Sequence, residues 1–315
     1  MTNFWKTIDK PLFALAPMEA VTDIVFRKVV KSAAQPDIYF SEFTNATGWV
    51  NAGEIAVGGR LDKTDDEHPL VAQLWGAIPE DIAQLAKYCA EQGYDGIDIN
   101  MGCPDKSAIK SGGGAALIKN PELAKQIIDA AKQSDLPVSV KTRLGFSRID
   151  EYEQWIRFLL SQEIEALTIH LRTKSEMSKV PAHFELLTDI VKIKNEIAPN
   201  TLLIANGDIH DRKLGQKLID QYGIDGVMIG RGVFNNPFVF EKDPQDHTKE
   251  ELFNLLNLHL DLYDQRGDAK RKFETLKRFF KIYIRDFDGA SSLRHELMQT
   301  TNTNEVRTLL KISTN

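Results

Sequence analysis

Cysteine and long apolar runs are both scarce in this chain of 315 residues. The two cysteines, Cys89 and Cys103, are too few for a disulfide framework, which favours a reducing compartment. No apolar run approaches the roughly 20 residues that a membrane-spanning helix needs. We therefore expect a cytoplasmic protein without a membrane segment. The seven histidines are scattered and there is no CxxC motif, so no metal site is expected.

An overall excess of positive charge is also missing, because the formal net charge is −6. The basic residues are nevertheless clustered, and residues 266–285 contain eight of them against two acidic ones. A cationic stripe on an acidic protein is typical of a surface that binds a polyanion such as RNA. The alternative is a solvated helix face, and composition does not separate the two interpretations.

Eight short apolar runs, rich in β-branched residues, predict eight strands, and most of the intervals between them show helical spacing of apolar residues. The expected strands are 12–16, 38–41, 70–74, 96–100, 138–141, 166–170, 202–205 and 226–229. This alternation predicts parallel strands that close into a (β/α)8 TIM barrel, with a doubly wound open sheet as the alternative. Polar residues follow the strands, as expected at the mouth of a barrel.

The alternation ends near residue 242, which predicts two domains, a barrel over 1–241 and a helical domain over 242–315. The polar barrel mouth makes the first the candidate catalytic domain, and the basic cluster makes the second the candidate RNA-binding domain. Within 270–287, apolar residues at steps of three and four predict one amphipathic helix. Arg271, Arg278 and Arg285 recur every seven residues and would form a basic row on that helix. Such a row can contact successive phosphates.

Two glycine-containing turns follow the seventh and eighth predicted strands, Ala205-Asn-Gly-Asp-Ile209 and Ile229-Gly-Arg-Gly232. Glycines let backbone N–H groups approach a phosphate, and these loops are the usual phosphate site of a β/α barrel. Arg231 would add a charge-assisted contact. The two turns together predict a phosphorylated cofactor.

Lys141 ends the fifth predicted strand, where a buried ammonium group requires an anionic partner. A reduced flavin carries negative charge on its pyrimidine ring and would be such a partner. Arg143 lies two residues further on and projects on the same side of the strand. A lysine that caps the sheet with a solvated ammonium group is the alternative.

The strongest chemical signal is Cys103, which follows the fourth predicted strand in Asp98-Ile-Asn-Met-Gly-Cys-Pro104. Its thiol is a candidate nucleophile or, with an unperturbed pKa of about 8.5, a general acid that stays protonated near neutrality. Cys89 lies in an amphipathic helical pattern and is interpreted as a core residue. The glycine run over 111–116 is interpreted as a flexible loop near the substrate.

Together these motifs resemble the bacterial tRNA-dihydrouridine synthase family. The resemblance keeps order and spacing from about residue 12 into the C-terminal helices. It is carried by Ala16-Pro-Met18, Ser41-Glu-Phe43, Gln73, Asp98-Ile-Asn-Met-Gly-Cys-Pro104, Ser111-Gly-Gly-Gly-Ala-Ala-Leu117, Lys141-Thr-Arg-Leu-Gly145, Ala205-Asn-Gly-Asp-Ile209, Gly230-Arg-Gly232 and Asn236-Pro-Phe238.

The resemblance implies an FMN-dependent enzyme that reduces specific uridines in tRNA to 5,6-dihydrouridine, with NADPH as the reductant. Cys103 would be the proton donor, and Asn100, Arg143, Arg172, Arg271 and Arg278 would contact the RNA substrate. FMN would be bound by Pro17, Met18, Gln73, Lys141, His170, Asn206, Gly207, Asp208, Gly230 and Arg231. A monomer is expected. The competing functions are the same chemistry on ribosomal RNA, reduction of a free pyrimidine or enone, and an RNA-binding scaffold on a retired barrel.

One segment departs from the family pattern after the sixth predicted strand. The usual His-Gly-Arg-Thr is here His170-Leu-Arg-Thr173, and the tyrosine that normally follows is missing from 174–184. His170 and Arg172 are retained, so flavin binding is expected to persist while substrate positioning is altered.

Overall fold

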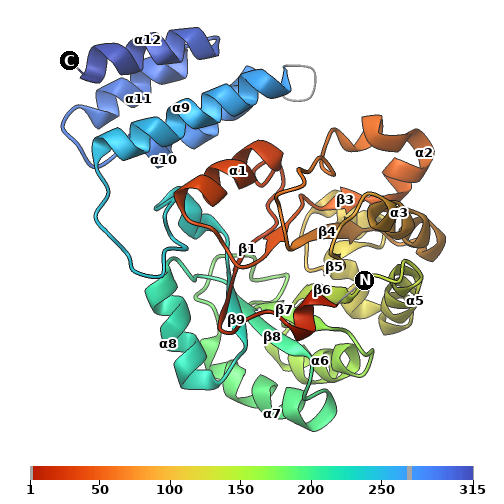
Figure 1. The fold of residues 1–315 in the computed structure, drawn as a ribbon. Coiled ribbons are helices and arrows are strands. Elements are labelled where there is room, and N and C mark those ends of the chain that lie inside the picture. The colour runs from red at the N-terminus through yellow and green to blue at the C-terminus, as the bar shows by residue number, and fades with distance from the viewer. Residues whose placement is uncertain (1–2, 268–271, 315) are drawn as a thin grey trace.

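The structure, a computed structural model, describes residues 3–267 and 272–314. Its centre is a barrel of parallel strands, coloured red to green-blue along the chain in Figure 1. The strands are β1 (Leu12–Leu15), β2 (Tyr39–Phe40), β3 (Thr44–Asn45), β4 (Leu70–Trp75), β5 (Gly96–Met101), β6 (Val138–Arg143), β7 (Ala166–His170), β8 (Leu202–Asn206) and β9 (Gly226–Ile229).

The sheet order is β1-β9-β8-β7-β6-β5-β4-β2, and β3 adds to β4 just beyond β2. A parallel bridge between Ala14 and Ile38 joins the two ends of this order, which closes the barrel. The predicted (β/α)8 barrel is therefore confirmed, and the open-sheet alternative is wrong. Four strands continue further than expected, because β4, β5, β6 and β8 extend to Trp75, Met101, Arg143 and Asn206.

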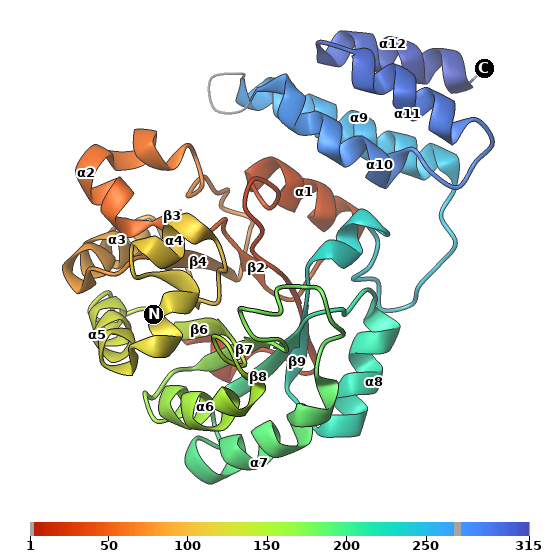
Figure 2. The ribbon, with the colours of Figure 1, turned by 180° about the vertical axis from the view of Figure 1, so that it is seen from behind.

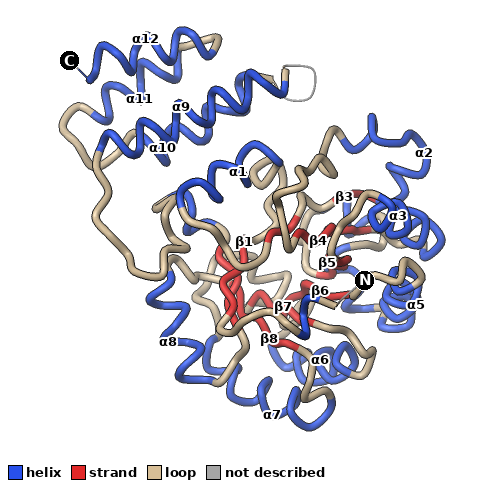
Figure 3. The backbone as a smooth tube through the Cα atoms, in the orientation of Figure 1, coloured by secondary structure: helices blue, strands red, loops and turns tan. Residues whose placement is uncertain are grey.

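Helices surround the barrel, as the backbone tube in Figure 3 shows. They are α1 (Ile24–Ala33), α2 (Ala46–Val57), α3 (Pro79–Glu91), α4 (Lys106–Lys110), α5 (Pro121–Lys132), α6 (Tyr152–Leu160), α7 (Leu187–Ile197) and α8 (Arg212–Tyr222). Short 3-10 turns accompany them: η1 (Phe4–Lys6), η2 (Gly114–Lys119), η3 (Ile149–Glu151), η4 (Phe184–Leu186) and η5 (Arg231–Phe234).

Local sequence explains these boundaries. Asp23, Asn120 and Asp211 cap α1, α5 and α8 by accepting a backbone N–H with their side chains. Inside the barrel, one face of the strands forms a separate apolar cluster that includes Leu12, Phe40 and Met228. The opposite face packs against the helices, which accounts for the nearly continuous apolar runs in the sequence.

Helices alone follow the barrel: α9 (Lys249–Arg266), η6 (Phe273–Phe279), α10 (Phe280–Tyr283), α11 (Ala290–Gln299) and α12 (Thr303–Thr314). This helical region lies beside α1, as both views of the ribbon show (Figures 1 and 2). Phe26 of α1 packs against Phe279, with ring centroids 4.8 Å apart, and Arg266 forms an ion pair of 3.3 Å with Asp23. The predicted boundary at 241/242 falls between η5 and α9, and independent folding of the two parts stays a prediction.

The expected single helix over 270–287 is wrong. The described part of this segment is the 3-10 helix η6 followed by one turn of α-helix, and Ile284 already has a non-helical ψ of 84°. Three residues per turn bring Phe273, Leu276 and Phe279 to one buried face. The basic row is consequently broken between Arg278 and Arg285, and Arg271 lies outside the described residues.

Within the described residues, no helix is both long enough and apolar enough to cross a membrane.

Candidate active site

Two clefts open at the carboxyl ends of the strands. The first has a volume of about 810 Å³ and lies at the ends of β1, β6, β7, β8 and β9. Its walls contain nine of the ten residues expected to bind the cofactor, namely Pro17, Met18, Lys141, His170, Asn206, Gly207, Asp208, Gly230 and Arg231. We call it the cofactor cleft. Gln73, the tenth, is fully buried and does not line it.

The backbone at the ends of β8 and β9 suits a phosphate. Gly207 has a φ of +108°, where side chains are strained, and a Cβ there would come within 3.5 Å of His170. At Gly230 a Cβ would come within 3.6 Å of Ala16 and Met18, so a side chain would begin to fill the cleft. Arg231 reaches over this floor with an exposed guanidinium, 3.4 Å from the carboxylate of Asp208.

Lys141 holds its ammonium group at the inner end of the cofactor cleft and donates to Oδ1 of Asn206 at 3.1 Å. The Asn206 amide is oriented by its own donation to the carbonyl of Met228 at 2.7 Å. Burial, reinforced by the positive charge of Arg143, lowers the pKa of Lys141 to about 8. An anionic ligand in the cleft would remove this penalty by supplying the missing counter-charge.

His170 forms the wall between Lys141 and Gly207. Burial, together with the surrounding cations, lowers the pKa of its imidazole to about 2, so the ring is neutral at physiological pH. Its Nδ1 is buried without a hydrogen-bond partner among the described residues. A buried, unpaired ring nitrogen at a cleft wall is a position where a ligand would complete the hydrogen bonding.

Asp208 joins the cofactor cleft to the atypical loop 171–183. Its carboxylate accepts from the guanidinium of Arg172 and, at 3.1 Å, from the backbone N–H of Ala182. Arg172 is 2% exposed and also donates to the carbonyl of Val180. Leu171, which replaces the family glycine, is fully buried and bonds through its backbone to Asn206 and His183. The core therefore accommodates the larger residue.

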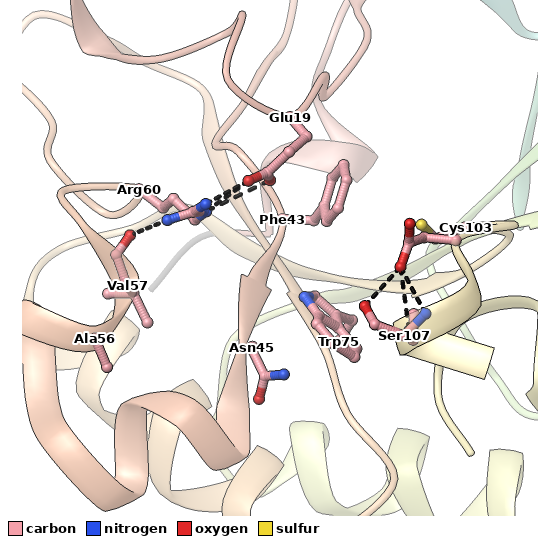
Figure 4. Close-up of a pocket in the computed structure, with 11 residues that line it drawn as sticks. Glu19, Phe43, Asn45, Ala56, Val57, Arg60, Trp75, Cys103 and Ser107 are labelled. Carbon is pink, nitrogen blue, oxygen red and sulfur yellow. Dashed lines mark hydrogen bonds and ion pairs between the residues drawn. The ribbon is translucent and has the colours of Figure 1, made fainter. Parts of the chain in front are cut away.

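The second cleft, of about 420 Å³, contains Cys103, and we call it the Cys103 cleft. Figure 4 shows Phe43 and Trp75 between the ion pair of Glu19 with Arg60 on one side and Cys103 on the other. The sequence alone did not identify Phe43, Trp75, Glu19 or Arg60 as functional residues. Trp75 lies two residues after Gln73 on β4, and side chains two residues apart point to the same face of a strand. This alternation could have predicted that Trp75 lies near the site.

Cys103 is presented on a turn that is fixed from both sides. The side chain of Asn100 accepts the N–H groups of Gly102 and Cys103, at 3.1 and 2.9 Å. The carbonyl of Cys103 accepts from Ala115 at 3.0 Å, and a Cβ on Gly114 would lie only 2.8 Å from that carbonyl. The glycine run is therefore packed against the turn rather than forming the flexible loop expected from sequence.

Burial, with a further contribution from the Asp105 carboxylate, raises the pKa of the Cys103 thiol, which stays protonated at neutral pH. A partly exposed, protonated thiol can donate a proton but is a poor nucleophile. Cys89 differs, because it is fully buried in α3 and its pKa is raised well above the usual value by burial alone.

Arg143 lies beneath the Cys103 turn. Its guanidinium donates to the backbone carbonyls of Gly102, Thr173 and Met177, at 2.8, 3.1 and 3.0 Å. These bonds tie the Cys103 turn to loop 171–183. Neither Arg143 nor Arg172 lines either cleft, and their predicted contact with substrate stays a prediction.

The helical region also reaches the mouth of the barrel. Lys281 of α10 lines the cofactor cleft, with its ammonium group 5.0 Å from the ring centroid of Phe234. Arg278 donates to the carbonyl of Ala20 at 3.1 Å, and Arg285 donates to the carbonyl of Asn235. Sequence reasoning missed Lys281 in the cleft, because no local pattern reports a contact between segments so far apart in the chain.

A parallel β/α barrel with a glycine-lined, cationic cleft at its mouth and a protonated thiol in a neighbouring cleft defines a class of protein, the cofactor-dependent barrel enzymes. In the described residues, no group of three or more His, Cys, Asp or Glu side chains could hold a metal ion.

Comparison with known proteins specifies the family. Residues 14–315 match the model of the dihydrouridine synthase family. "Probable tRNA-dihydrouridine synthase 2" of Bacillus subtilis is 52% identical over 98% of this chain and 95% of the relative. "Probable tRNA-dihydrouridine synthase" of Staphylococcus aureus is 54% identical over 98% of this chain and 94% of the relative. This chain belongs to the dihydrouridine synthase family.

A more distant likeness is to a solved complex of 2-naphthoyl-CoA reductase with 2-naphthoyl-CoA. The TM-score is 0.52 at 11% identity, over 74% of this chain and 50% of that chain. At this identity the likeness concerns the barrel fold alone.

Proposed function

We propose that this protein is an FMN-dependent, NADPH-driven tRNA-dihydrouridine synthase of the bacterial cytoplasm. The observation that carries the proposal is the pairing of the two clefts, one cationic and glycine-lined, the other holding a protonated thiol. Membership of the family and the names of its curated relatives support uridine in tRNA as the substrate.

The residues of the cofactor cleft fit FMN. Backbone at Gly207 and Gly230, with the guanidinium of Arg231, would hold the phosphate. Lys141 and the unpaired Nδ1 of His170 would contact the polar edge of the ring system. Lys281 would add a second cation near the phosphate from the helical region. When bound, the flavin, reduced by NADPH, supplies the hydride that adds to C6 of the uracil.

The protein's own part in the reaction is to hold the base and deliver a proton. The target uridine must leave its stack to enter the Cys103 cleft. Phe43 and Trp75 offer apolar surface there and exclude water. Cys103 Sγ then donates its proton to C5 and is reprotonated from solvent. Its raised pKa keeps the proton available at neutral pH.

The test uses a strain that lacks this gene and the same strain carrying it. Dihydrouridine in transfer and ribosomal RNA would be quantified by mass spectrometry, and the flavin of the purified protein would be identified by its absorbance and mass. We expect FMN in the protein and dihydrouridine in tRNA only when the gene is present. Dihydrouridine that depends on the gene only in ribosomal RNA, or a colourless protein, would contradict the proposal.

A further inference from the structure

A buried chain of polar side chains leads from the barrel interior to the Cys103 turn. Asp98 and Gln73 are 0% exposed, and Asn100 is 6% exposed. Strand register sets this arrangement, since Asp98 of β5 lies opposite Gln73 of β4 on one side and Ser139 of β6 on the other. Asn100 follows on the same face of β5, two residues further along.

The hydrogen bonds in this chain are continuous. Ser139 Oγ donates to Asp98 Oδ1 at 2.7 Å, and Gln73 Nε2 donates to Asp98 Oδ2 at 2.7 Å. Asn100 Nδ2 then donates to Gln73 Oε1 at 3.0 Å. The Oδ1 of Asn100 is left to accept from the backbone N–H groups of Gly102 and Cys103.

A carboxylate at one end of such a chain determines which atom of each amide donates a hydrogen bond and which accepts one. The two ends of an amide side chain are nearly identical in shape, but an ionised carboxylate only accepts hydrogen bonds. Asp98 therefore forces Gln73 to turn its NH₂ group inward, which in turn forces Asn100 to turn its oxygen toward the Cys103 turn. In the reverse orientation the NH₂ group of Asn100 would face two N–H donors, and the turn would lose both bonds.

We propose that Asp98 is a positioning residue for Cys103, acting through Gln73 and Asn100 to fix the turn that presents the thiol. This inference rests on the proposed function and deepens it, because it gives a second residue a part in the proton donation assigned to Cys103. Burial raises the pKa of Asp98 to about 6, opposed by the bonds from Ser139 and Gln73, so the carboxylate is ionised at neutral pH.

An alternative is that Asp98 merely ties β4, β5 and β6 together. A charge exchange separates the two roles. In Asp98→Asn the inward end of the chain is an amide, and either orientation of Gln73 becomes possible. Adding Gln73→Glu restores a carboxylate one position along the chain. This carboxylate accepts from the amide introduced on β5 and from Asn100, so Asn100 keeps its oxygen toward the turn.

The experiment compares the wild type, Asp98→Asn, Gln73→Glu and the double variant, all carrying Cys89→Ala so that Cys103 is the only thiol. The first readout is the rate of dihydrouridine formation per bound flavin, with tRNA concentration varied. We expect Asp98→Asn to lower kcat on the order of 10- to 100-fold, the range that a small misplacement of a reacting group produces. KM for tRNA should stay constant, and the double variant should recover most of kcat.

The second readout needs neither flavin reduction nor RNA, and so it tests the positioning even if the proposed function fails. Iodoacetamide alkylation of Cys103 would be followed against pH. A loosened turn exposes the thiol, so Asp98→Asn should alkylate faster, with a midpoint shifted downward toward the unperturbed value of about 8.5. The double variant should return to the wild-type profile. An unchanged profile in Asp98→Asn, or a double variant that resembles Asp98→Asn in both readouts, would overturn the proposal.

Discussion

The cations at the barrel mouth and those of the helical region are of the same types but lie in different environments. Arg143 is buried and Lys141 is partly buried, and burial lowers the pKa of Lys141 to about 8 and that of Arg143 to about 10. Arg278 and Lys281 lie on the exposed surface beside the same mouth. Under the proposed function, the desolvated groups would set the chemistry, whereas the exposed groups next to the mouth would supply attraction for an anion.

The largest expected effect concerns the two cysteines, which also differ in environment, since Cys89 is fully buried and Cys103 is partly exposed. Cys103→Ala should leave flavin binding and NADPH oxidation intact but reduce dihydrouridine formation below detection, because no other protonated thiol lines that cleft among the described residues. Cys89→Ala, the matched control, should form product at the wild-type rate and lose only some packing stability. Normal product from Cys103→Ala would remove Cys103 from the mechanism.

Reversal of charge at Arg231 should have the next largest effect. Arg231→Glu places a second carboxylate beside Asp208, directly where a phosphate would bind. We expect the Kd for FMN to rise by about tenfold or more, because attraction becomes repulsion. Fluorescence titration of the apoprotein measures this, with Lys213→Glu on the exposed surface of α8 as the control. Equal affinity in the two variants would place the phosphate elsewhere.

Lys141 predicts a pH dependence of cofactor binding. Its ammonium group has a pKa of about 8 in the free protein, and a hydrogen bond from this group to the polar edge of the bound flavin would raise that pKa, so binding takes up a proton above pH 8. FMN affinity should therefore be level below a pH of about 8 and fall above it, by at most about tenfold per pH unit. In Lys141→Met the affinity should be lower throughout, and this alkaline decline should be absent. An identical decline in the variant would assign it to another group.

The smallest effect is expected at the exposed cation Arg278. Arg278→Ala should weaken RNA binding and flatten the log–log salt dependence by about 0.7 to 0.9 of a unit, as for one lost phosphate contact. Reduction of the flavin by NADPH should not change. The control is Lys217→Ala on α8. An unaltered salt slope would mean that Arg278 serves only to hold the carbonyl of Ala20.

The barrel was largely predictable from sequence, and so was the helical character of the region that follows it. The type of helix within 272–287 was not. Apolar runs such as 226–229 identified strands because a strand covered on both faces leaves few polar positions. In 272–287 the apolar residues also recur regularly, but they allow two patterns. Steps of three and four fit an α-helix, whereas Phe273, Leu276 and Phe279, at steps of three, fit a 3-10 helix. Tertiary packing against Phe26 decided between them, and no local pattern contains that information.

The candidate site was predictable where function depends on residue type and position along a strand. His170 and Asn206 end neighbouring strands and are register partners. Lys141 lies on β6, two residues before Arg143, which is the register partner of His170, so parallel register brings the three residues together. Strand position alone did not predict the place of Gln73, which is buried between Asp98 and Asn100 rather than in the cofactor cleft. The place of Lys281 could not be predicted from strand position either, since this residue reaches the cofactor cleft only through the docking of the helical region.

A single-turnover experiment tests whether a reduced flavin and the Cys103 thiol together reduce uridine in tRNA. The purified protein would be reduced with one equivalent of NADPH and mixed, without oxygen, with unmodified tRNA transcript. Flavin oxidation and dihydrouridine would be measured in the same samples. We expect one dihydrouridine for each flavin oxidised in the wild type, and none in Cys103→Ala. Flavin that stays reduced, or is oxidised without the appearance of dihydrouridine in the wild type, would contradict this expectation.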